Sequence, residues 1–357
     1  MNHFGAIRAA LDTFDLDAML LTCAPNRFYA SGFASTGTDG VALVTKTDTY
    51  YYTDFRYIEA AQKTVTNASV IMTERGRGYI DLLAEAIQKH GLRRIGYEDE
   101  YMTVADYMAY CEKLPCEFVR ATRLMRELRA SKTPAEIETL ISAQRIAERA
   151  LDEILNDIHP GATEKELAAK LTYLMLRYGA ENVSFDPIVL SGANGSMPHG
   201  VPSEKAILEG EFVTMDFGCI YQGYCSDMTR TVAVGHVSEE MERVYHIVLK
   251  AQCAGIKKVA AGVTGREVDA AAREIIAKEG YGEYFGHSFG HGVGVEIHET
   301  PNASPANEKP LCEGAVISAE PGIYLPGHFG VRIEDVVIVR RDGCENITKA
   351  PKELQIL

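Results

Sequence analysis

The first 128 residues alternate between two spacings of apolar residues, and this alternation predicts an α/β domain. Helical spacing is found in Phe4–Phe14, Tyr57–Gln62, Ile80–Lys89 and Val104–Lys113. Short apolar or aromatic runs, which are typical of strands, occupy Ala18–Leu21, Val41–Thr45, Tyr50–Thr53 and Ile95–Tyr97. We therefore expect residues 1–128 to form one domain with a sheet of several strands.

Polar segments between these elements are expected to be rich in turns. They are NRFYASGF at Asn26–Phe33 and TDFRY at Thr53–Tyr57. Their Arg and Tyr side chains either serve structural packing or contribute to a pocket shared with the next domain. The aromatic run Tyr50–Tyr52 is expected to be a strand with one buried face, and a contact between two copies of the chain is the alternative. No phosphate-binding glycine loop occurs in this domain.

The segment Arg129–Pro134 is expected to link this domain to a second one at 129–357. Helices with apolar residues at helical spacing begin after the N-cap residues Thr133, Thr163, Ser238 and Thr264. A glutamate follows each threonine after three positions, as in a capping box. Residues 134–234 contain two helices and then strand-like runs, and 238–340 repeat this order. We infer two structurally similar halves that face one another.

Each half carries two acidic residues within strands that are otherwise apolar. In the first half, Asp216 and Asp227 are equidistant from the point between Tyr221 and Gln222. If the hairpin turns there, the two carboxylates face each other with Cβ atoms about 4.5–5.5 Å apart. Buried carboxylates at this distance repel one another, so we expect a cation between them, most simply a divalent metal ion.

The second half repeats this arrangement with Glu320 and Glu334, whose midpoint is Gly327. Between the two hairpins, the glycine-rich segment Gly286–Glu299 contains His287, His291 and His298. This segment fits neither the dinucleotide-binding pattern nor a P-loop. A lone histidine is usually structural, but three of them beside converging carboxylates favour a functional site.

A set of mostly oxygen ligands with one imidazole suits Mn²⁺, Co²⁺ or Fe²⁺, and Zn²⁺ also fits. Mg²⁺ is disfavoured because it prefers water to imidazole. Four carboxylates and one histidine hold one ion generously or two naturally. Without the histidines, paired acids in hairpins are more often a solvated face or a calcium site. Cys219 and Cys225 flank the first turn, but they lack companions at the spacing of a zinc site.

Composition and charge limit the kinds of molecule that the protein is expected to bind. The chain has 36 basic and 50 acidic residues among 357, and the net charge of −14 argues against nucleic acid and anionic membranes as partners. We find no signal peptide and no apolar run approaching the about 18 residues of a membrane span. The eight cysteines are scattered, which is typical of free thiols. We therefore expect a cytoplasmic protein.

Five short motifs resemble those of the metallopeptidases of the methionine aminopeptidase and prolidase type, which have the pita-bread fold. The motifs are MDFG, SDMTR, GHGVG, SAEPG and RIED, around Asp216, Asp227, His291, Glu320 and Glu334. The first domain is similar to the creatinase/prolidase N-terminal domain. Within this group, the chain resembles the Xaa-Pro branch, which comprises aminopeptidase P and prolidase. The residues that carry this likeness are Pro198, His199, His287, His298 and Arg332. Creatinase keeps the fold but lacks the metal ligands, whereas all five are present here.

The resemblance implies a site with two divalent metal ions, with Mn²⁺ favoured over Co²⁺, Fe²⁺ and Zn²⁺. Asp227 and Glu334 would bridge the ions, Asp216 would complete one of them, and His291 and Glu320 would complete the other. A hydroxide that bridges the metals would attack the scissile carbonyl. Glu320 would also shuttle a proton.

Four more residues receive roles from the same resemblance. His287 and His298 would stabilise the oxyanion or contact the substrate backbone. His199 would bind the substrate or protonate around the proline nitrogen. Arg332 is interpreted both as an ion-pair partner of a ligating acid and as a substrate-binding residue.

The activity that this implies is hydrolysis of the bond between an N-terminal residue and proline, in Xaa-Pro dipeptides or in longer peptides. A proline imide lacks an N–H and has a fixed φ, so general peptidases handle it poorly. One alternative is a methionine aminopeptidase-like enzyme, against which Arg332 and the N-terminal domain argue. The other is a catalytically silent peptide-binding protein, which would have no use for five metal ligands. The resemblance also implies a homodimer.

Overall fold

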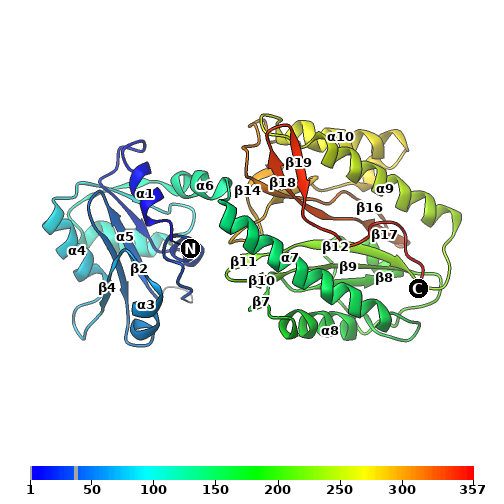
Figure 1. Ribbon diagram of the computed structural model, residues 1–357, viewed down its shortest axis with the longest axis horizontal. Coiled ribbons are helices and arrows are strands. Elements are labelled where there is room, and N and C mark those ends of the chain that lie inside the picture. The colour runs from blue at the N-terminus through cyan, green and yellow to red at the C-terminus, as the bar shows by residue number, and fades with distance from the viewer. Residues whose placement is uncertain (1, 36–38) are drawn as a thin grey trace. The chain divides into compact units, whose positions relative to one another are not determined.

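The computed structural model describes residues 2–35 and 39–357, and the chain forms two compact units, Met1–Arg129 and Ala130–Leu357 (Figure 1). Each unit has its own hydrophobic core and its own sheets. Within the described residues, no helix is both long enough and apolar enough to cross a lipid bilayer.

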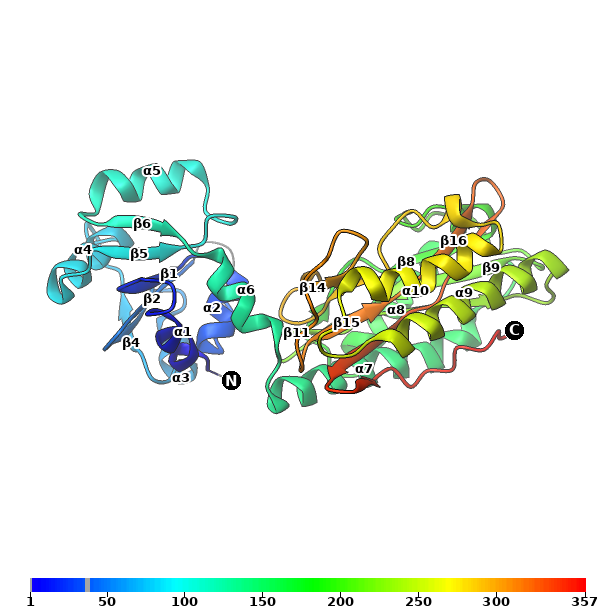
Figure 2. The same cartoon turned by 90° about the horizontal axis from the view of Figure 1, so that it is seen from above.

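The first unit contains one mixed sheet of six strands. The strands are β1 (Ala18–Leu21), β2 (Val41–Thr45), β3 (Thr49–Thr53), β4 (Ser69–Met72), β5 (Arg94–Tyr97) and β6 (Glu117–Arg120), in the order β4-β3-β2-β1-β5-β6. The helices are α1 (Phe4–Ala10), α2 (Ala24–Ser31), α3 (Ile58–Thr64), α4 (Tyr79–His90), α5 (Val104–Lys113) and α6 (Thr122–Ala130). Leu20, Leu43 and Tyr52 on one face of the sheet share a core with Leu83 of α4. Figure 2 shows α5 and α3 on opposite sides of the sheet.

Several local predictions for this unit are wrong. Most of Asn26–Phe33 lies in α2, because Pro25 suits a first helical turn and Gly32, with φ 73°, suits a left-handed C-cap. The first helix ends earlier than predicted, and the turns that follow close at Asp15, where φ is 52°. Strand β3 is buried on both faces, since Tyr51 is as enclosed as Tyr52. The last residues of α6 occupy the start of the predicted linker.

The second unit contains two helix pairs and the strands between them (Figure 1). Its first half comprises α7 (Pro134–Ile154), α8 (Glu164–Arg177), β7 (Asn182–Val183), β8 (Ile188–Ser191), β9 (Phe212–Phe217), β10 (Cys219–Tyr221), β11 (Tyr224–Cys225) and β12 (Met228–Ala233). Its second half comprises α9 (Glu239–Lys258), α10 (Gly265–Lys278), β13 (Gly290–Gly292), β14 (Glu299–Ala303), β15 (Val316–Ala319), β16 (Gly322–Leu325), β17 (Phe329–Arg332), β18 (Asp335–Arg340) and β19 (Gly343–Asn346). Short 3₁₀ turns lie at Leu155–Asp157, Gly192–Ser196 and Gly282–Tyr284.

Each half buries its helix pair against its own sheet. The first core joins α7 and α8 to the sheet β12-β9-β8, and the second joins α9 and α10 to the sheet β14-β13-β15-β18-β19. The predicted capping boxes at Thr133, Thr163 and Thr264 are confirmed, as is the Ser238 cap. The predicted repeat of two helices and an acid-bearing hairpin, the pita-bread fold, is confirmed.

The two acid-bearing hairpins differ in how well their register was predicted. In the first, Asp216 pairs with Thr229, and the turn is formed by Gln222 and Gly223, with φ 47° and 75°. The prediction that Asp216 faces Asp227 is therefore wrong, because the turn is centred one residue later than predicted, between Gln222 and Gly223. Positive φ at both central residues defines this two-residue turn, and the symmetry of the acids does not reveal it. Because side chains alternate, Asp227 still lies on the same face as Asp216, diagonally displaced.

In the second hairpin the predicted register is confirmed. Leu325 pairs with Phe329 around Gly327 in the β16–β17 ladder. The β15–β18 ladder continues the same register, with Ala319 opposite Asp335. Glu320 and Glu334 therefore occupy equivalent positions in the gap between two ladders.

Candidate active site

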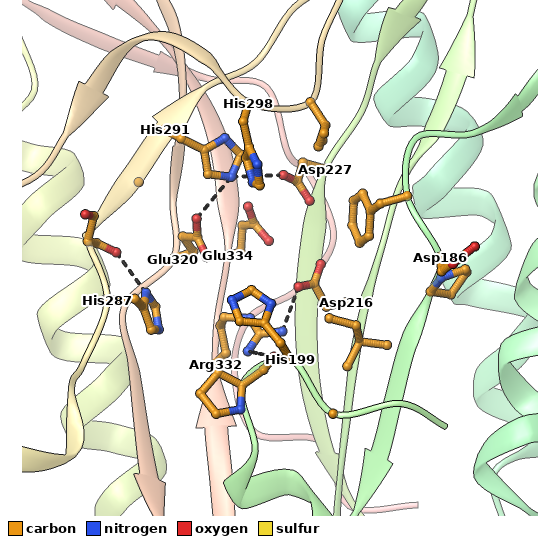
Figure 3. A pocket seen from close by; sticks show the side chains of 18 of the residues that line it. Asp186, His199, Asp216, Asp227, His287, His291, His298, Glu320, Arg332 and Glu334 are labelled. Carbon is orange, nitrogen blue, oxygen red and sulfur yellow. Dashed lines mark hydrogen bonds and ion pairs between the residues drawn. The ribbon is translucent and has the colours of Figure 1, made fainter. Parts of the chain in front are cut away.

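All five predicted metal ligands line one cavity of about 620 Å³ in the second unit. Figure 3 shows their side chains converging from both halves. They are Asp216 in β9, Asp227 directly before β12, His291 in β13, Glu320 directly after β15 and Glu334 directly before β18. The four acidic ligands thus lie in the strands of the two hairpins or directly beside them, where strand pairing fixes the direction of each side chain.

The ligand atoms lie at distances that suit a shared cation. Single ligand atoms of Asp227, His291 and Glu334 all lie within 4.8 Å of one another. His291 Nε2 lies 3.5 Å from Asp227 Oδ2 and 3.2 Å from Glu320 Oε1. Asp216 Oδ1 and Glu334 Oε1 are buried oxygens without a hydrogen-bond partner. Since buried polar atoms are rarely left unpaired, this donor-poor group of oxygens fits divalent metal ions.

The charges of the cluster are adjusted by burial and by one ion pair. Burial raises the pKa values of Asp227 and Glu334 well above the ordinary carboxyl range, and the neighbouring acids raise them further. Burial disfavours the charged forms of His291 and Glu320, but their mutual hydrogen bond raises the pKa of His291 to about 9 and lowers that of Glu320 to about 2. The cluster is therefore balanced by protons in the metal-free protein, and metal ions would displace these protons.

Arg332 is a buried ion-pair partner within the site. Its Nη2 donates to Asp216 Oδ2 at 2.6 Å, and its Nε donates to Thr229 Oγ1 at 3.1 Å. Its Nη1 donates to the Tyr324 hydroxyl at 2.9 Å. Arg332 is therefore an ion-pair partner of Asp216, one of the predicted ligands. Its role in substrate binding stays a prediction.

His287 takes part in a hydrogen-bond chain with Tyr324. Its Nδ1 lies 2.9 Å from the Ser288 carbonyl oxygen, which can only accept, so Nδ1 carries the proton. Its Nε2 then accepts from the Tyr324 hydroxyl at 2.8 Å, since burial lowers the pKa of His287 and keeps the ring neutral. His287 lines the cavity beside Tyr324, and both of its ring nitrogens are engaged within the protein.

The other two predicted histidines also line the cavity. The His298 ring packs edge-on against His291 at 4.2 Å between centroids. Burial, together with the His291 charge, lowers the pKa of His298 and favours its neutral form. His199 lies in the loop after the Gly192–Ser196 turn, and this loop is tied to α8 by Glu164, a buried carboxylate. Glu164 accepts hydrogen bonds from the backbone or side chains of Ser191, Asn194 and Ser203.

Sequence reasoning missed several residues that shape the site. Tyr324 lies four positions after Glu320, and strand alternation alone places both side chains on one face. Glu299, next to His298, pairs with buried Lys132 at 2.5 Å, and neither residue carried a motif signal. Cys219 and Cys225 lie outside the cavity lining, and burial raises the pKa of both thiols.

Comparison with known proteins identifies both parts of the chain. Residues 138–341 match the family model of metallopeptidase family M24, and residues 5–131 match that of the creatinase/prolidase N-terminal domain. A structure described as an Xaa-Pro dipeptidase from Bacillus anthracis is 45% identical, with a TM-score of 0.94 over 99% of both chains. An X-Pro aminopeptidase structure from Thermotoga maritima is 38% identical, with a TM-score of 0.90 over 96% of this chain and 98% of that one.

A curated relative supports the same assignment. The Xaa-Pro dipeptidase of Pyrococcus horikoshii is 39% identical over 350 residues, which cover 96% of each chain. Relatives at this identity along nearly the full length show the family as well as the fold. The chain therefore belongs to the Xaa-Pro peptidases of metallopeptidase family M24 and is a metallo-exopeptidase.

Proposed function

We propose that the protein hydrolyses the bond between an N-terminal residue and proline with two divalent metal ions held in this cavity. The observation that carries the proposal is the set of five converging ligands in which buried carboxylate oxygens have no donor. Relatives described as Xaa-Pro dipeptidases and as an X-Pro aminopeptidase support the specificity for proline. Mn²⁺ is the favoured ion for a site with mostly oxygen ligands and one imidazole.

The residues divide the work of holding the ions. Asp227 and Glu334 lie between the halves and would bridge the ions, Asp216 would complete one ion, and His291 with Glu320 would complete the other. Bound there, two divalent ions would polarise the scissile carbonyl and lower the pKa of water enough to supply a nucleophile near neutral pH. Glu320 lies beside His291 and would accept the proton of that water and pass it to the leaving proline nitrogen.

The remaining polar groups of the cavity would bind the substrate. His298 and His199 present their rings to the cavity, where an imidazole N–H can donate to the carbonyl oxygen as negative charge develops on it. Phe185, Ile188 and Ile297 provide apolar walls that suit a proline ring, which has no N–H to satisfy. The pocket thus needs no acceptor for an N–H on the substrate's proline nitrogen.

Three peptides test the proposal against its alternatives. The purified protein would be incubated with Mn²⁺ and Ala-Pro, Ala-Pro-Ala or Met-Ala-Ser, and the products separated by chromatography. We expect cleavage of one or both proline peptides, and their ratio distinguishes a dipeptidase from an aminopeptidase. Cleavage of Met-Ala-Ser alone would favour a methionine aminopeptidase-like enzyme, and no cleavage despite bound metal would favour a peptide-binding protein.

A pair of matched variants separates the site from the rest of the surface. Glu334→Ala removes a proposed bridging ligand and is expected to abolish cleavage. Glu345→Ala removes an exposed partner of Arg340 and is expected to leave cleavage unchanged. Equal activity of the two variants would contradict the assignment of the cavity as the active site.

A further inference from the structure

The segment of residues 347–357, which we call the tail, is fastened to both halves of the second unit. Glu148 of α7 accepts from the backbone N–H groups of Lys349 and Ala350. Tyr245 of α9 donates to the Lys352 carbonyl at 2.9 Å. Farther along, Ala233 of β12 exchanges backbone hydrogen bonds with the tail, which there runs alongside this edge strand. These contacts hold the tail much more firmly than a surface extension.

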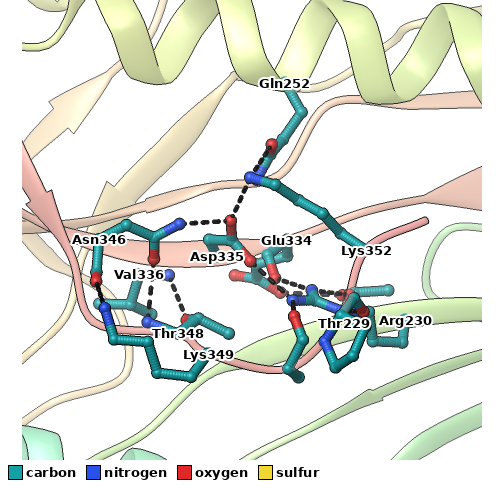
Figure 4. Close-up of polar contacts among 12 residues, drawn as sticks. Thr229, Arg230, Gln252, Glu334, Asp335, Val336, Asn346, Thr348, Lys349 and Lys352 are labelled. Atoms are coloured by element: carbon teal, nitrogen blue, oxygen red, sulfur yellow. Dashed lines mark hydrogen bonds and ion pairs between the residues drawn. The ribbon is translucent and has the colours of Figure 1, made fainter.

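Two buried residues close to the proposed ligand Glu334 bind this tail. Arg230 follows Thr229, whose hydroxyl donates to Glu334 Oε2 at 2.8 Å, and Asp335 follows Glu334 itself. Both Arg230 and Asp335 are buried, and Arg230 Nη2 donates to Asp335 Oδ1 at 2.8 Å. Figure 4 shows this pair between the two halves, with the side chain of Lys352 approaching from the tail.

Arg230 uses all five of its N–H donors, so its position is fully determined. Nη1 donates to the carbonyl oxygens of Thr229 and Glu334, which belong to opposite halves. Nε donates to the Pro351 carbonyl at 2.8 Å, and Nη2 also donates to the Ala350 carbonyl at 2.7 Å. The guanidinium thus contacts the backbone of Glu334, and the tail supplies two of its five acceptors.

Asp335 is held in the same way by three donors. Its Oδ1 accepts from Arg230, and its Oδ2 accepts from Asn346 Nδ2 at 2.7 Å and from Lys352 Nζ at 2.8 Å. Lys352 Nζ also donates to Gln252 Oε1 on α9 at 3.0 Å. Lys352 thus adds the second positive charge beside a buried carboxylate that adjoins Glu334.

We propose that Lys352 is a positioning residue of the metal site: through Asp335 and Arg230, the tail holds Glu334 where its unpaired oxygen can bind metal. This inference rests on the proposed function, because it assumes that Glu334 binds metal. It assigns to the tail a part in metal affinity in addition to stability. Groups that hydrogen-bond a metal ligand directly usually change metal affinity by about 10- to 100-fold when they are removed. Lys352 acts through Asp335 and Arg230, so we expect an effect at the lower end of this range.

The test compares two lysines of the tail. Lys352→Met removes the Asp335 contact, while Lys349→Met removes only a contact with the Asn346 carbonyl at 2.7 Å. Mn²⁺ binding to the metal-free full-length protein would be measured by isothermal titration calorimetry, and thermal unfolding would be measured on the same metal-free samples. We expect Lys352→Met to weaken Mn²⁺ binding about tenfold, and Lys349→Met to leave it unchanged.

A double-mutant cycle tests the route of the effect. In an Asp335→Asn background, Lys352→Met is expected to cause little further loss of Mn²⁺ affinity, because the partner of the lysine is already neutral. Lys352→Gln, which keeps a donor, is expected to lie between wild type and Lys352→Met, and it replaces the Met variant if that protein does not fold.

Three results would overturn the inference. They are unchanged Mn²⁺ affinity with a lowered unfolding temperature, equal losses in the two lysine variants, and additive losses in the cycle. Each leaves the proposed function intact, because wild-type protein still binds Mn²⁺. Wild-type protein that binds no Mn²⁺ would instead remove the proposed function, and the inference with it.

Discussion

Buried carboxylates occur in both units, but they are stabilised in opposite ways. In the first unit, Glu98 is fully enclosed and accepts from the backbone N–H groups of Thr22 and Cys23 at 2.6 and 2.7 Å and from Asn26 Nδ2 at 2.7 Å. In the second unit, Asp216 and Glu334 each keep a buried oxygen without a donor. A carboxylate surrounded by donors serves the fold, whereas carboxylates that face one another without donors require a cation.

The direction of the pKa shift does not reveal this difference. Burial raises the pKa of Glu98, and it also raises those of Asp227 and Glu334. What separates the two regions is the supply of hydrogen-bond donors around each oxygen. The comparison therefore predicts opposite outcomes when each carboxylate is replaced by its neutral amide.

The largest effect is expected from Glu334→Gln. Loss of a direct ligand should lower kcat/KM with a proline peptide by more than about 100-fold, beyond the range of supporting residues. The metal-free variant should unfold at a higher temperature than metal-free wild type, because an amide is neutral without the proton that the buried Glu334 carboxyl must take up on folding. Activity assays measure the loss of kcat/KM, and calorimetry on the same protein measures the rise in unfolding temperature. A metal-free variant less stable than metal-free wild type would contradict the proposed difference between the two regions.

Metal removal should be next in size. Because burial raises the folded-state pKa values of Asp227 and Glu334, these two carboxyls bind more protons in the metal-free folded protein than in the unfolded chain above about pH 4. Its free energy of unfolding therefore falls as pH rises through this window. Mn²⁺ at about 100 times its Kd adds about 3 kcal/mol, and the gap in unfolding temperature should widen with pH. Calorimetry with and without chelator across this range measures the gap, and a gap that narrows would contradict the shifts.

Glu98→Gln should have the reverse signature of Glu334→Gln. An amide NH₂ would face either the two backbone N–H groups or Asn26 Nδ2, and Asn26 cannot flip because its Oδ1 accepts from Arg129 at 2.8 Å. The resulting donor–donor conflict should cost about 2 kcal/mol of unfolding free energy. Urea unfolding measures this cost, with exposed Glu100→Gln as the matched control. The Mn²⁺ affinity of the folded variant should be unchanged. A loss of affinity would contradict the view that Glu98 serves only the fold.

The smallest effect is expected from Tyr324→Phe, within the cavity. The hydroxyl accepts from Arg332 and donates to His287, so its loss leaves two buried groups short of one partner. We expect kcat/KM to fall about five- to tenfold, which corresponds to about 1 kcal/mol for a lost hydrogen bond. Tyr221→Phe at the hairpin turn is the control and should be neutral. An unchanged kcat/KM for Tyr324→Phe would show that the hydrogen bonds from Arg332 through Tyr324 to His287 do not support the metal ligands.

Features with local signals could be predicted from the sequence. Capping boxes depend on residues three positions apart, and they appear as predicted at Thr133 and Thr163. The β16–β17 register follows from a turn centred on Gly327, so the placement of Glu320 and Glu334 could be derived. The four acids came from the same short-range patterns, whereas the resemblance to the peptidase family singled out His291 among the three histidines of Gly286–Glu299.

Features that depend on distant partners could not be predicted. Glu98 stands in a charged stretch, YEDE, that suggests solvent, and only the packed strands bring Thr22 and Asn26 to it. Arg230 lies in a motif, but two of its five acceptors come from the tail more than a hundred residues later. The first hairpin was misplaced because Gln222, an ordinary residue, adopts a positive φ there.

The shared register of the two ladders around Glu320 and Glu334 restricts which insertions and deletions the gene can tolerate. Extra residues within the turn at 326–328 leave both ladders paired as before, so this loop can change length during evolution. A single residue gained or lost between Glu320 and Leu325 would put the β16–β17 ladder out of step with the β15–β18 ladder, so the two ladders could no longer share one register around Glu320 and Glu334. Only a matching change on the returning strand would restore the pair, so the spacing of the two acids should change in step or not at all.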